Sequence, residues 1–243
     1  MKEGFSGTGE LFGSIAGTGA LGPFSPADPS APQEEQAKDV FRAMSAALAA
    51  AGLGWKDVVR TWFYLDGIYS WYPVFNRVRT EFFAANGIVR LPASTGIGLK
   101  AGEGALTAAF LAAPGGWNSV ESPLQVPATD YKSSFSRAAE ADGVLYVSGT
   151  AAILPGSHEV AFPCDAAAQT RCTLDAVEAI LRSRGTRWEK VSRAVAYVKR
   201  PEDAAASRQA VLARGLPEDK MLFLVADVCR DGWLFEIEVD AAL

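Results

Sequence analysis

Histidine and cysteine are scarce in this sequence of 243 residues, which contains one histidine and three cysteines. The single histidine, His158, cannot supply a histidine-rich metal site, and the cysteines lack the paired short spacings of a zinc site. Their odd number, together with the lack of a signal-peptide pattern, predicts free thiols in a reducing compartment. We therefore expect a cytoplasmic protein that holds no metal.

Long apolar runs and basic clusters are also absent. The longest apolar runs, 44–53 and 221–226, are much shorter than the ~20 residues that cross a bilayer. The formal charge is −5, and no cluster of lysines and arginines is available to neutralise phosphates, which argues against nucleic acid as a partner. The sequence thus predicts a soluble protein whose partner is a small molecule or another copy of itself.

What the sequence does contain is a duplication, visible when the chain is compared with itself at an offset of about 133 residues. The matching pairs are Gly52 and Gly185, Trp55 and Trp188, Val58 and Val191, Arg60 and Arg193, and Tyr64 and Tyr197. The segments before them, 39–52 and 169–185, both carry apolar residues at spacings of three and four and both end in glycine, which is typical of amphipathic helices.

Each copy has the same predicted order of elements, namely strand, helix, strand, helix and two further strands. The expected strands are 11–17, 58–65, 92–100 and 105–113 in the first copy and 144–150, 191–199, 221–229 and 233–241 in the second. The second helix of each copy is expected at 73–87 and 201–215. This order predicts an α/β (α+β) protein with units at 1–113 and 131–243, joined by a turn-rich linker at 114–130.

The glycines Gly17, Gly19 and Gly22 satisfy the spacing G-x-G-x-x-G of a dinucleotide-binding turn. The residues that follow, PFSPADPSAP, cannot open the helix that such a turn requires, because proline removes backbone donors. We interpret the motif as a chance match. His158 lies in a loop flanked by proline and glycine without a G-x-S-x-G elbow to host a serine, so a surface position is expected for it.

The segment FEIEVD near the C-terminus predicts a strand with one apolar and one acidic face, because side chains alternate along a strand. The acidic face carries Glu236, Glu238 and Asp240. A half-solvated sheet face is one interpretation. A functional role is the other, since an alignment of GALTAAF with GWLFEIE puts Ala108 and Phe110 opposite the two glutamates, so the first copy lacks them.

The order of elements and the repeated landmarks resemble the Rid (YjgF) family over nearly the whole chain, twice. The resemblance implies two tandem units, each a mixed β-sheet covered on one face by two helices, and assembly as a trimer with ligand sites between neighbouring units. A trimer is also expected because the second face of each sheet needs a cover.

Within that fold the chain more closely resembles the chorismatases, tandem proteins that hydrolyse chorismate to pyruvate and a ring acid. The matching stretches are RTWFYLDGIYSWYPVFNRVRTEFF, PASTGIG, SPLQVPATDYKSSFSRA, VSGTAAI and DVCRDGWLFEIEVDA. The chain differs from that family in a shorter N-terminal part and a short loop at 154–160.

The resemblance implies that the second unit carries the active site and that Glu236 is a neutral acid which protonates the methylene carbon of the enolpyruvyl group, with Glu238 left as the alternative acid. Burial beside Phe235 and Trp233 and repulsion by nearby carboxylates are expected to raise its pKa. Water or a ring hydroxyl then attacks the oxocarbenium ion, and neither a metal nor an organic cofactor is needed.

Chorismate carries two carboxylates, so the pocket should hold at least two cationic or strong donor groups. The candidates are Gln125, Tyr131, Arg137, Arg208 and, in the first unit, Arg77, with surface salt bridges as the other interpretation for the last two arginines. Gly149 is expected to bring a backbone N–H close to an anion because it has no Cβ.

Two further residues are expected to set the ring product. The resemblance implies that Cys229 favours 3-hydroxybenzoate, although an inert buried thiol is an equal interpretation, whereas Ala152 stands near a position where a small side chain admits the ring. The sequence thus predicts a chorismatase that releases pyruvate with 3-hydroxybenzoate or a dihydroxycyclohexadiene carboxylate.

Two alternatives from other classes remain open at the level of sequence. One is a Rid-type imine or enamine deaminase, for which the arginine expected early in the fifth strand is missing from PASTG and DKMLF. The other is a regulatory module that binds a small ligand without catalysis.

Overall fold

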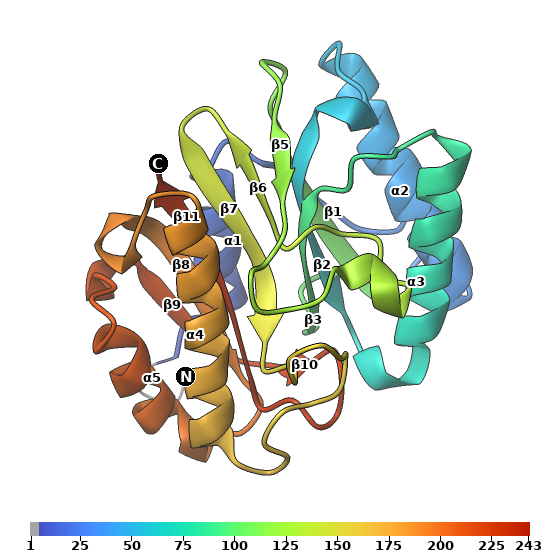
Figure 1. Cartoon of the computed structure of the whole chain (residues 1–243). Helices are drawn as coiled ribbons and strands as arrows, with labels where there is room; N and C mark the ends of the chain where they lie inside the picture. Colours follow the sequence, from blue (N-terminus) through green and yellow to red (C-terminus); the bar gives the residue numbers. More distant parts are fainter. Residues whose placement is uncertain (1–4) are drawn as a thin grey trace.

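The computed structural model describes residues 5–243, which form two mixed β-sheets, one in each unit (Figure 1). The strand order is β1-β4-β2-β3-β10 in the first sheet and β5-β6-β7-β11-β8-β9 in the second. The pairs β2–β3 and β8–β9 are parallel and the other pairs are antiparallel. The predicted fold of two mixed sheets is therefore confirmed.

The strands of the first unit are β1 (Leu21–Phe24), β2 (Val58–Leu65), β3 (Ala93–Gly98) and β4 (Leu106–Ala112). The linker contributes β5 (Asn118–Val120) to the second sheet. The strands of the second unit are β6 (Ala138–Ala141), β7 (Val144–Ala151), β8 (Val191–Val198), β9 (Met221–Val225), β10 (Asp227–Val228) and β11 (Phe235–Ala242). Short 3-10 turns lie at Trp55–Asp57, Ala128–Tyr131, Trp188–Lys190, Pro201–Asp203 and Glu218–Lys220.

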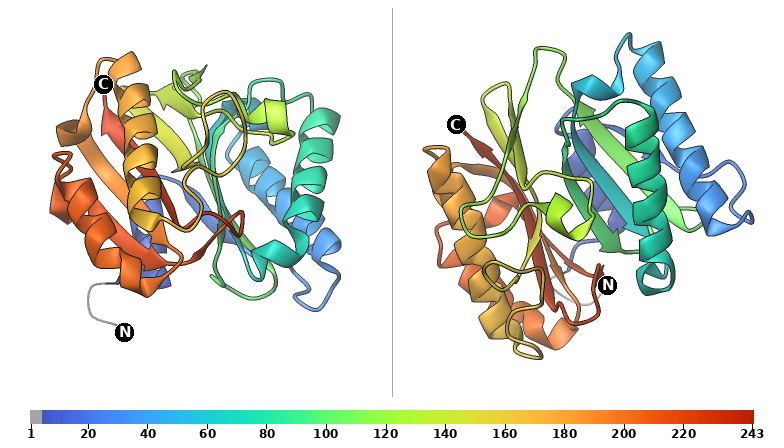
Figure 2. Two further views of the ribbon diagram at one scale, coloured as in Figure 1. Left: turned by 60° about the horizontal axis from the view of Figure 1, so that its bottom comes forward. Right: turned by 45° about the vertical axis from the view of Figure 1, so that its right-hand side comes forward.

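Two helices cover the outer face of each sheet, as the sequence predicted (Figure 2). Helices α2 (Gln33–Ala50) and α3 (Ile68–Ala85) cover the first sheet, and α4 (Ala166–Ser183) and α5 (Ala204–Leu212) cover the second. Helix α4 begins where the Asp165 carboxylate accepts a hydrogen bond of 2.9 Å from the Ala168 N–H. The left-handed φ of Gly52 (71°) and Gly185 (72°) lets the chain turn away after α2 and α4.

The prediction of a strand at 11–17 was wrong, because these residues belong to helix α1 (Thr8–Ala16). Leu11 and Ile15, four residues apart, lie on one side of the helix and are buried in an apolar cluster that includes residues of both sheets. The Glu10 carboxylate accepts a hydrogen bond of 2.7 Å from the Gly7 N–H at the first turn. The first strand of the unit is instead β1, which pairs with β4.

The inner faces of the two sheets pack against each other within the chain (Figure 2). Their shared apolar cluster contains Trp62 and Leu111 from the first sheet and Tyr146 and Leu224 from the second. The duplicated tyrosines Tyr64 and Tyr197 meet at its centre, with their hydroxyls 3.2 Å apart. The open sheet face that motivated the prediction of a trimer is thus covered by the chain itself, and the trimer stays a prediction.

The register of β4 and β11 corrects the alignment of the two copies by one residue. Glu236 pairs with Tyr197, and the residue that pairs with the equivalent Tyr64 is Thr107, not Ala108. A shift of one residue exchanges the two faces of a strand, and accordingly Ala108 and Phe110 pack on the helix-covered side. The inference that the first copy lacks the carboxylates is unaffected.

The strand predicted at 221–229 is divided between the two sheets. Strand β9 pairs with β8, and after Ala226 the chain crosses over so that β10 pairs with β3 of the first unit. Gly98 permits this pairing, because a Cβ there would lie 2.6 Å from the Cβ of Asp227. The crossing brings residues 229–236 to the border between the units. None of the helices within 5–243 is long and apolar enough to span a membrane.

Candidate active site

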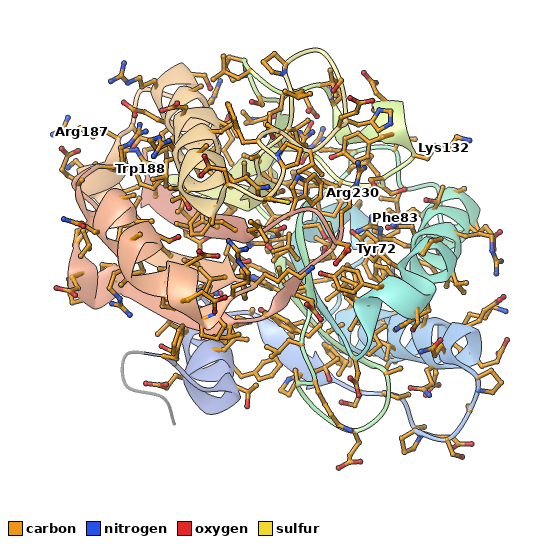
Figure 3. All side chains as sticks on the ribbon, turned by 90° about the horizontal axis from the view of Figure 1, so that it is seen from below. Tyr72, Phe83, Lys132, Arg187, Trp188 and Arg230 are labelled. Atoms are coloured by element: carbon orange, nitrogen blue, oxygen red, sulfur yellow. The ribbon has the colours of Figure 1, made fainter. Side chains whose placement is uncertain are left out.

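A pocket with about 500 Å³ of empty volume, including its mouth, lies at the border between the two units. The first unit contributes four lining residues, Tyr72, Arg79, Ser94 and Gly96. The second contributes the remainder, among them Tyr131, Arg137, Cys229, Arg230 and Glu236. Figure 3 shows Tyr72 and Arg230 near each other at this junction. Both units therefore build the pocket, whereas the sequence assigned the active site to the second unit and the linker, with Arg77 as a candidate from the first unit.

Glu236 is the buried acid of the pocket. It lies on β11 on the face opposite Phe235 and Ile237, which pack under the helices. Burial, reinforced by repulsion from Glu238 and opposed by Arg137, raises the pKa of Glu236 to about 8. The carboxyl group therefore carries a proton at neutral pH and can act as an acid.

The raised pKa of Glu236, and burial and repulsion by a carboxylate as its causes, agree with the expectation from the sequence. Trp233 lines the pocket as expected, but the expectation of burial beside Phe235 was wrong, because Phe235 lies on the opposite face of the strand.

The acidic face of β11 is not half-solvated. Glu236, Glu238 and Asp240 are 3%, 0% and 2% exposed, because the first sheet covers them. Glu238 and Asp240 form ion pairs with the buried arginines Arg60 and Arg193. Glu236 forms no ion pair among residues 5–243, so only Glu238 and Asp240 of the three are neutralised by cations.

Gly149 makes room for the acid instead of binding an anion. A Cβ at this position would collide with the Glu236 carboxyl group. The Gly149 N–H donates a hydrogen bond of 3.1 Å to Thr95 Oγ1, so it is not directed at a ligand as the sequence reasoning expected. The glycine is required here by space, since the Glu236 carboxyl group occupies the place that a side chain would take.

Two guanidinium groups line the pocket without an acidic partner. Arg137 and Arg79 are each 2% exposed, and neither forms an ion pair within the described part of the chain. Arg137 donates from Nε and Nη2 to the Val126 carbonyl at 3.1 and 2.7 Å. Arg79 donates from Nη2 to Asn76 at 2.8 Å, while its buried Nε has no partner in this structure.

Burial makes these two arginines unusual, because neither has an ion-pair partner within residues 5–243. Removing a charge from water costs several kcal/mol unless it is compensated, and burial indeed lowers the pKa of Arg79. A guanidinium binds a carboxylate through two parallel hydrogen bonds. The pocket thus presents two cationic groups and a neutral acid, an arrangement suited to a ligand with more than one negative charge.

Tyr131 and Cys229, both expected at the site, also line the pocket. The Tyr131 ring lies under Arg137 and Arg230, with centroid distances of 5.5 and 5.3 Å. Burial and repulsion from Glu236 raise the pKa of Cys229 to about 12, although a hydrogen bond with Tyr72 opposes this. The Cys229 side chain is therefore a thiol at neutral pH, and the structure contains free cysteines as predicted.

A family comparison agrees with the duplication. A model described as endoribonuclease L-PSP matches residues 14–103 and 127–243, so it covers both units. The chain belongs to the endoribonuclease L-PSP family. Membership confirms the tandem fold that the sequence predicted through its resemblance to Rid proteins.

Within the endoribonuclease L-PSP family the chain is similar to proteins named for chorismate chemistry. It is 30% identical to a 3-hydroxybenzoate synthase of Streptomyces hygroscopicus over 218 residues, 76% of this chain and 63% of that protein. It is 31% identical to a chorismatase of Streptomyces rapamycinicus, covering 76% of this chain and 64% of that one. The chain therefore spans less than two thirds of the length of these curated relatives.

The fold is also similar to a crystal structure of a chorismatase. The TM-score is 0.76 at 27% identity, and the match covers 92% of this chain and 73% of the other. The resemblance to chorismatases found in the sequence is thus supported both by sequence comparison and by three-dimensional similarity.

The two helix arginines proposed from the sequence lie outside the pocket of this endoribonuclease L-PSP family member. Arg77 is exposed and pairs with Glu34 at 2.6 Å and with Glu81 at 3.4 Å. Arg208 lies on α5 over the Phe223 ring, 3.7 Å from Glu218. Arg77 misses the pocket because of helical geometry. Residues two positions apart on a helix point to nearly opposite sides, and Arg79, two positions after Arg77, lines the pocket.

The pocket residue on this helix that was not predicted from the sequence is Arg79. Its position could have been found from the apolar residues Phe75, Val78 and Phe83, which share the buried side of α3 with it. In the comparison of the two copies Arg77 is the counterpart of Arg208, which favoured Arg77 as the pocket residue. Arg230 was also missed, and only the crossing of β10 to the first sheet brings it to the pocket.

Gln125 and Ala152 lie beside the pocket instead of lining it. The Gln125 side chain is buried and donates a hydrogen bond of 2.8 Å to the Ala151 carbonyl. Ala152 is buried, and its carbonyl accepts a hydrogen bond of 2.7 Å from Trp233 Nε1. The small residue at the pocket wall is Ala151, one position earlier in the strand.

Within residues 5–243 no group of three histidine, cysteine, aspartate or glutamate side chains is arranged to hold a metal ion. His158 is exposed, as expected, with its ring centroid 6.1 Å from that of Tyr131.

The raised pKa of Glu236 predicts that stability falls as the pH rises. The unfolded chain ionises this group near 4.5, whereas the folded chain keeps the proton to about 8. The favourable contribution of Glu236 is therefore complete below the unfolded pKa and is lost as the pH rises through the folded one. Glu236→Gln should be more stable than the wild type at pH 8 by on the order of a few kcal/mol.

This advantage should shrink toward pH 5, which urea unfolding followed by tryptophan fluorescence at pH 5, 6.5 and 8 can measure. The same pH dependence in the two proteins would contradict a buried proton on Glu236.

Proposed function

We propose that this protein cleaves chorismate and releases pyruvate. The observation that carries the proposal is the combination, in one pocket, of a protonated buried acid, Glu236, with two buried guanidiniums, Arg79 and Arg137, that form no ion pair within residues 5–243. Chorismate offers two carboxylates and an acid-labile enol ether. The similarity to proteins named chorismatase and 3-hydroxybenzoate synthase supports the same substrate.

In the proposed reaction Glu236 transfers its proton to the methylene carbon of the enolpyruvyl group. A C–H bond forms, and positive charge develops on the carbon that bears the ether oxygen. Water adds to this carbon, the resulting hemiketal breaks its bond to the ring oxygen, and pyruvate leaves with the ring alcohol. A proton released from the added water restores the neutral acid.

The neutral state of Glu236 matters for binding as well as for proton transfer. An ionised acid in the pocket would repel the carboxylates of the substrate, whereas a neutral one leaves Arg79 and Arg137 free to attract them. Arg230 is a further cation at the wall, held by a hydrogen bond of 2.5 Å to the His158 carbonyl and by the rings of Tyr131 and Trp233.

The direct test is incubation of the purified protein with chorismate and measurement of pyruvate through a coupled dehydrogenase. Pyruvate formation proportional to protein concentration is the expected result. In parallel, the protein is incubated with an imine substrate, and ammonia release would indicate a deaminase. Binding of chorismate without formation of pyruvate would contradict the proposed cleavage.

We infer that the ring product is 3-hydroxybenzoate. The Cys229 thiol lies in the same pocket as Glu236 and can direct the neighbouring ring hydroxyl, in place of water, at the ring carbon that bears the enolpyruvyl oxygen. A new C–O bond closes an arene oxide while the bond from that carbon to the enolpyruvyl oxygen breaks; pyruvate leaves, and the hydroxyl proton restores Glu236. The arene oxide then opens, its second ring carbon loses a proton and the oxygen gains one, so the atoms of chorismate divide between pyruvate and 3-hydroxybenzoate without added water.

Cys229→Ala is therefore expected to shift the product toward the dihydroxycyclohexadiene acid while pyruvate release continues. Liquid chromatography of the reaction measures both products. Cys172→Ala is a suitable control, because Cys172 is half-buried on α4 outside the pocket. A wild-type reaction that yields only the diene acid would contradict this assignment.

A further inference from the structure

Glu238 is the most strongly neutralised carboxylate between the two sheets. Its Oε1 accepts a hydrogen bond of 3.0 Å from Trp62 Nε1 and lies 2.8 Å from Arg193 Nη2. Its Oε2 lies 3.1 Å from Arg60 Nη2. The group is completely buried, and although burial acts to raise its pKa, attraction by Arg60 and Arg193 outweighs burial and lowers it.

Glu236 lies on the same face of β11, two residues earlier, so about 7 Å separates the positions of the two side chains along the strand. No arginine forms an ion pair with Glu236 in the described part of the chain. The ionisable groups that act on Glu236 are Glu238 on its own strand, Arg137 before β6, Tyr72 on α3 and Cys229 after β10. The two glutamates are thus close neighbours with opposite surroundings.

The groups that face Glu238 come from both units. Arg60 and Tyr64 lie on β2 of the first unit, and Arg193 and Tyr197 lie on β8 of the second. Asp240 shares both arginines, at 3.6 Å from Arg60 and 3.3 Å from Arg193. Two cations and two carboxylates therefore balance, and no positive charge of this network remains for Glu236.

The duplication explains where the cations come from. Arg60 and Arg193 occupy equivalent positions in the two copies, but only β11 carries carboxylates, because the residues that pair with Tyr64 and Trp62 on β4 are Thr107 and Ala109. The first unit therefore supplies a cation to a charge cluster that belongs to the second.

We propose that Glu238, kept ionised by Arg193 and by Arg60 of the first unit, is a positioning residue that confines the proton of the acid pair to Glu236. The inference rests on the proposed function and deepens it. Two neighbouring carboxyl groups titrate as a pair, and a fixed negative charge on one of them disfavours ionisation of the other. Glu238 does not line the pocket. It acts only through the negative charge that it places near Glu236.

The first test is the pH dependence of kcat in Glu238→Gln. The amide removes the negative charge and leaves one positive charge of the network unbalanced, since Asp240 still pairs with both arginines, so Glu236 loses its proton more easily. The basic limb of the profile is expected to move to lower pH by about one unit or more, with kcat at the acidic plateau within about threefold of the wild type and KM little changed. A uniform loss of kcat with an unmoved basic limb would overturn the proposal.

Asp240→Asn is the matched control, because it removes one carboxylate from the same network at about twice the distance from Glu236. It should move the basic limb less than Glu238→Gln. Equal shifts in the two variants would show that the network acts through its structure and not through the charge beside the acid.

A second measurement does not depend on activity or on the folding of the Glu238 variant. In protein labelled with carbon-13 at the glutamate carboxyl groups, one resonance should titrate near pH 8 and vanish in Glu236→Gln. A late-titrating resonance that persists in Glu236→Gln, or its absence from the wild type, would overturn the proposal. If chorismate is not cleaved but this resonance is found, the proposed substrate fails while the placement of the proton stands.

Discussion

Glutamine at position 236 is expected to lower the rate of pyruvate release from chorismate by about 10²–10⁴-fold, the usual worth of a general acid. The amide has nearly the shape of the protonated carboxyl group, so the space left by Gly149 remains filled. It cannot deliver a proton to the methylene carbon. Steady-state kinetics should show the loss in kcat, and calorimetry should show that a dicarboxylate inhibitor still binds with an affinity close to that of the wild type.

Glu103→Gln, in an exposed loop, is the control for the substitution itself. It should leave kcat unchanged. Retention of more than about a tenth of the wild-type rate in Glu236→Gln would show that Glu236 is not the acid, since so small a loss of rate falls outside the range expected of general acid catalysis.

Removal of a pocket guanidinium should weaken the binding of a benzoate-type dicarboxylate by about 1.5–3 kcal/mol, or more than tenfold in Kd, because each charged hydrogen bond is worth that much. Arg79→Met and Arg137→Ala test the two groups separately. In Arg79→Met the free energy of unfolding is expected to stay the same or rise, since a buried charge without a counterion is replaced by an apolar side chain.

Arg77→Met is the matched control, two residues away on the exposed side of α3. It should leave Kd unchanged. An unchanged Kd in Arg79→Met, or a loss of stability equal to the loss of binding, would indicate that Arg79 supports the fold and does not bind the ligand.

Repetition and alternation in the sequence were sufficient to predict the duplication, the four helices of the sheets and the acidic face of β11. They did not predict correctly which residue lies on the pocket side of a helix or pairs at a given place in a sheet, because an error of one or two positions changes both. Arg77 and Arg79 differ in function because of the side of α3 on which each lies, and Thr107 instead of Ala108 is the counterpart of Glu236 because of the register of β4. Neither can be fixed from local pattern alone.

The position of the pocket could not be predicted for a different reason. The sequence contains no local signal that the chain leaves the second sheet after Ala226 and pairs with β3. This crossing brings Cys229 and Arg230 against the first unit and opposite Tyr72. Likewise, the sequence predicts that the inner face of each sheet must be covered by another element. Only the packing of the two units shows that each sheet covers the other.

The equivalence of Thr107 and Glu236 has a consequence for inheritance. In an oligomer of identical one-unit chains, one codon determines the residue at the equivalent position of every subunit. A mutation that introduces a buried acid would therefore place it at every subunit interface. In this chain the two positions have separate codons, and a mutation at one is not repeated at the other. Selection can therefore act on the acid-bearing half of the pocket and on the Arg79 half independently, and an asymmetric site can arise from a symmetric ancestor one substitution at a time.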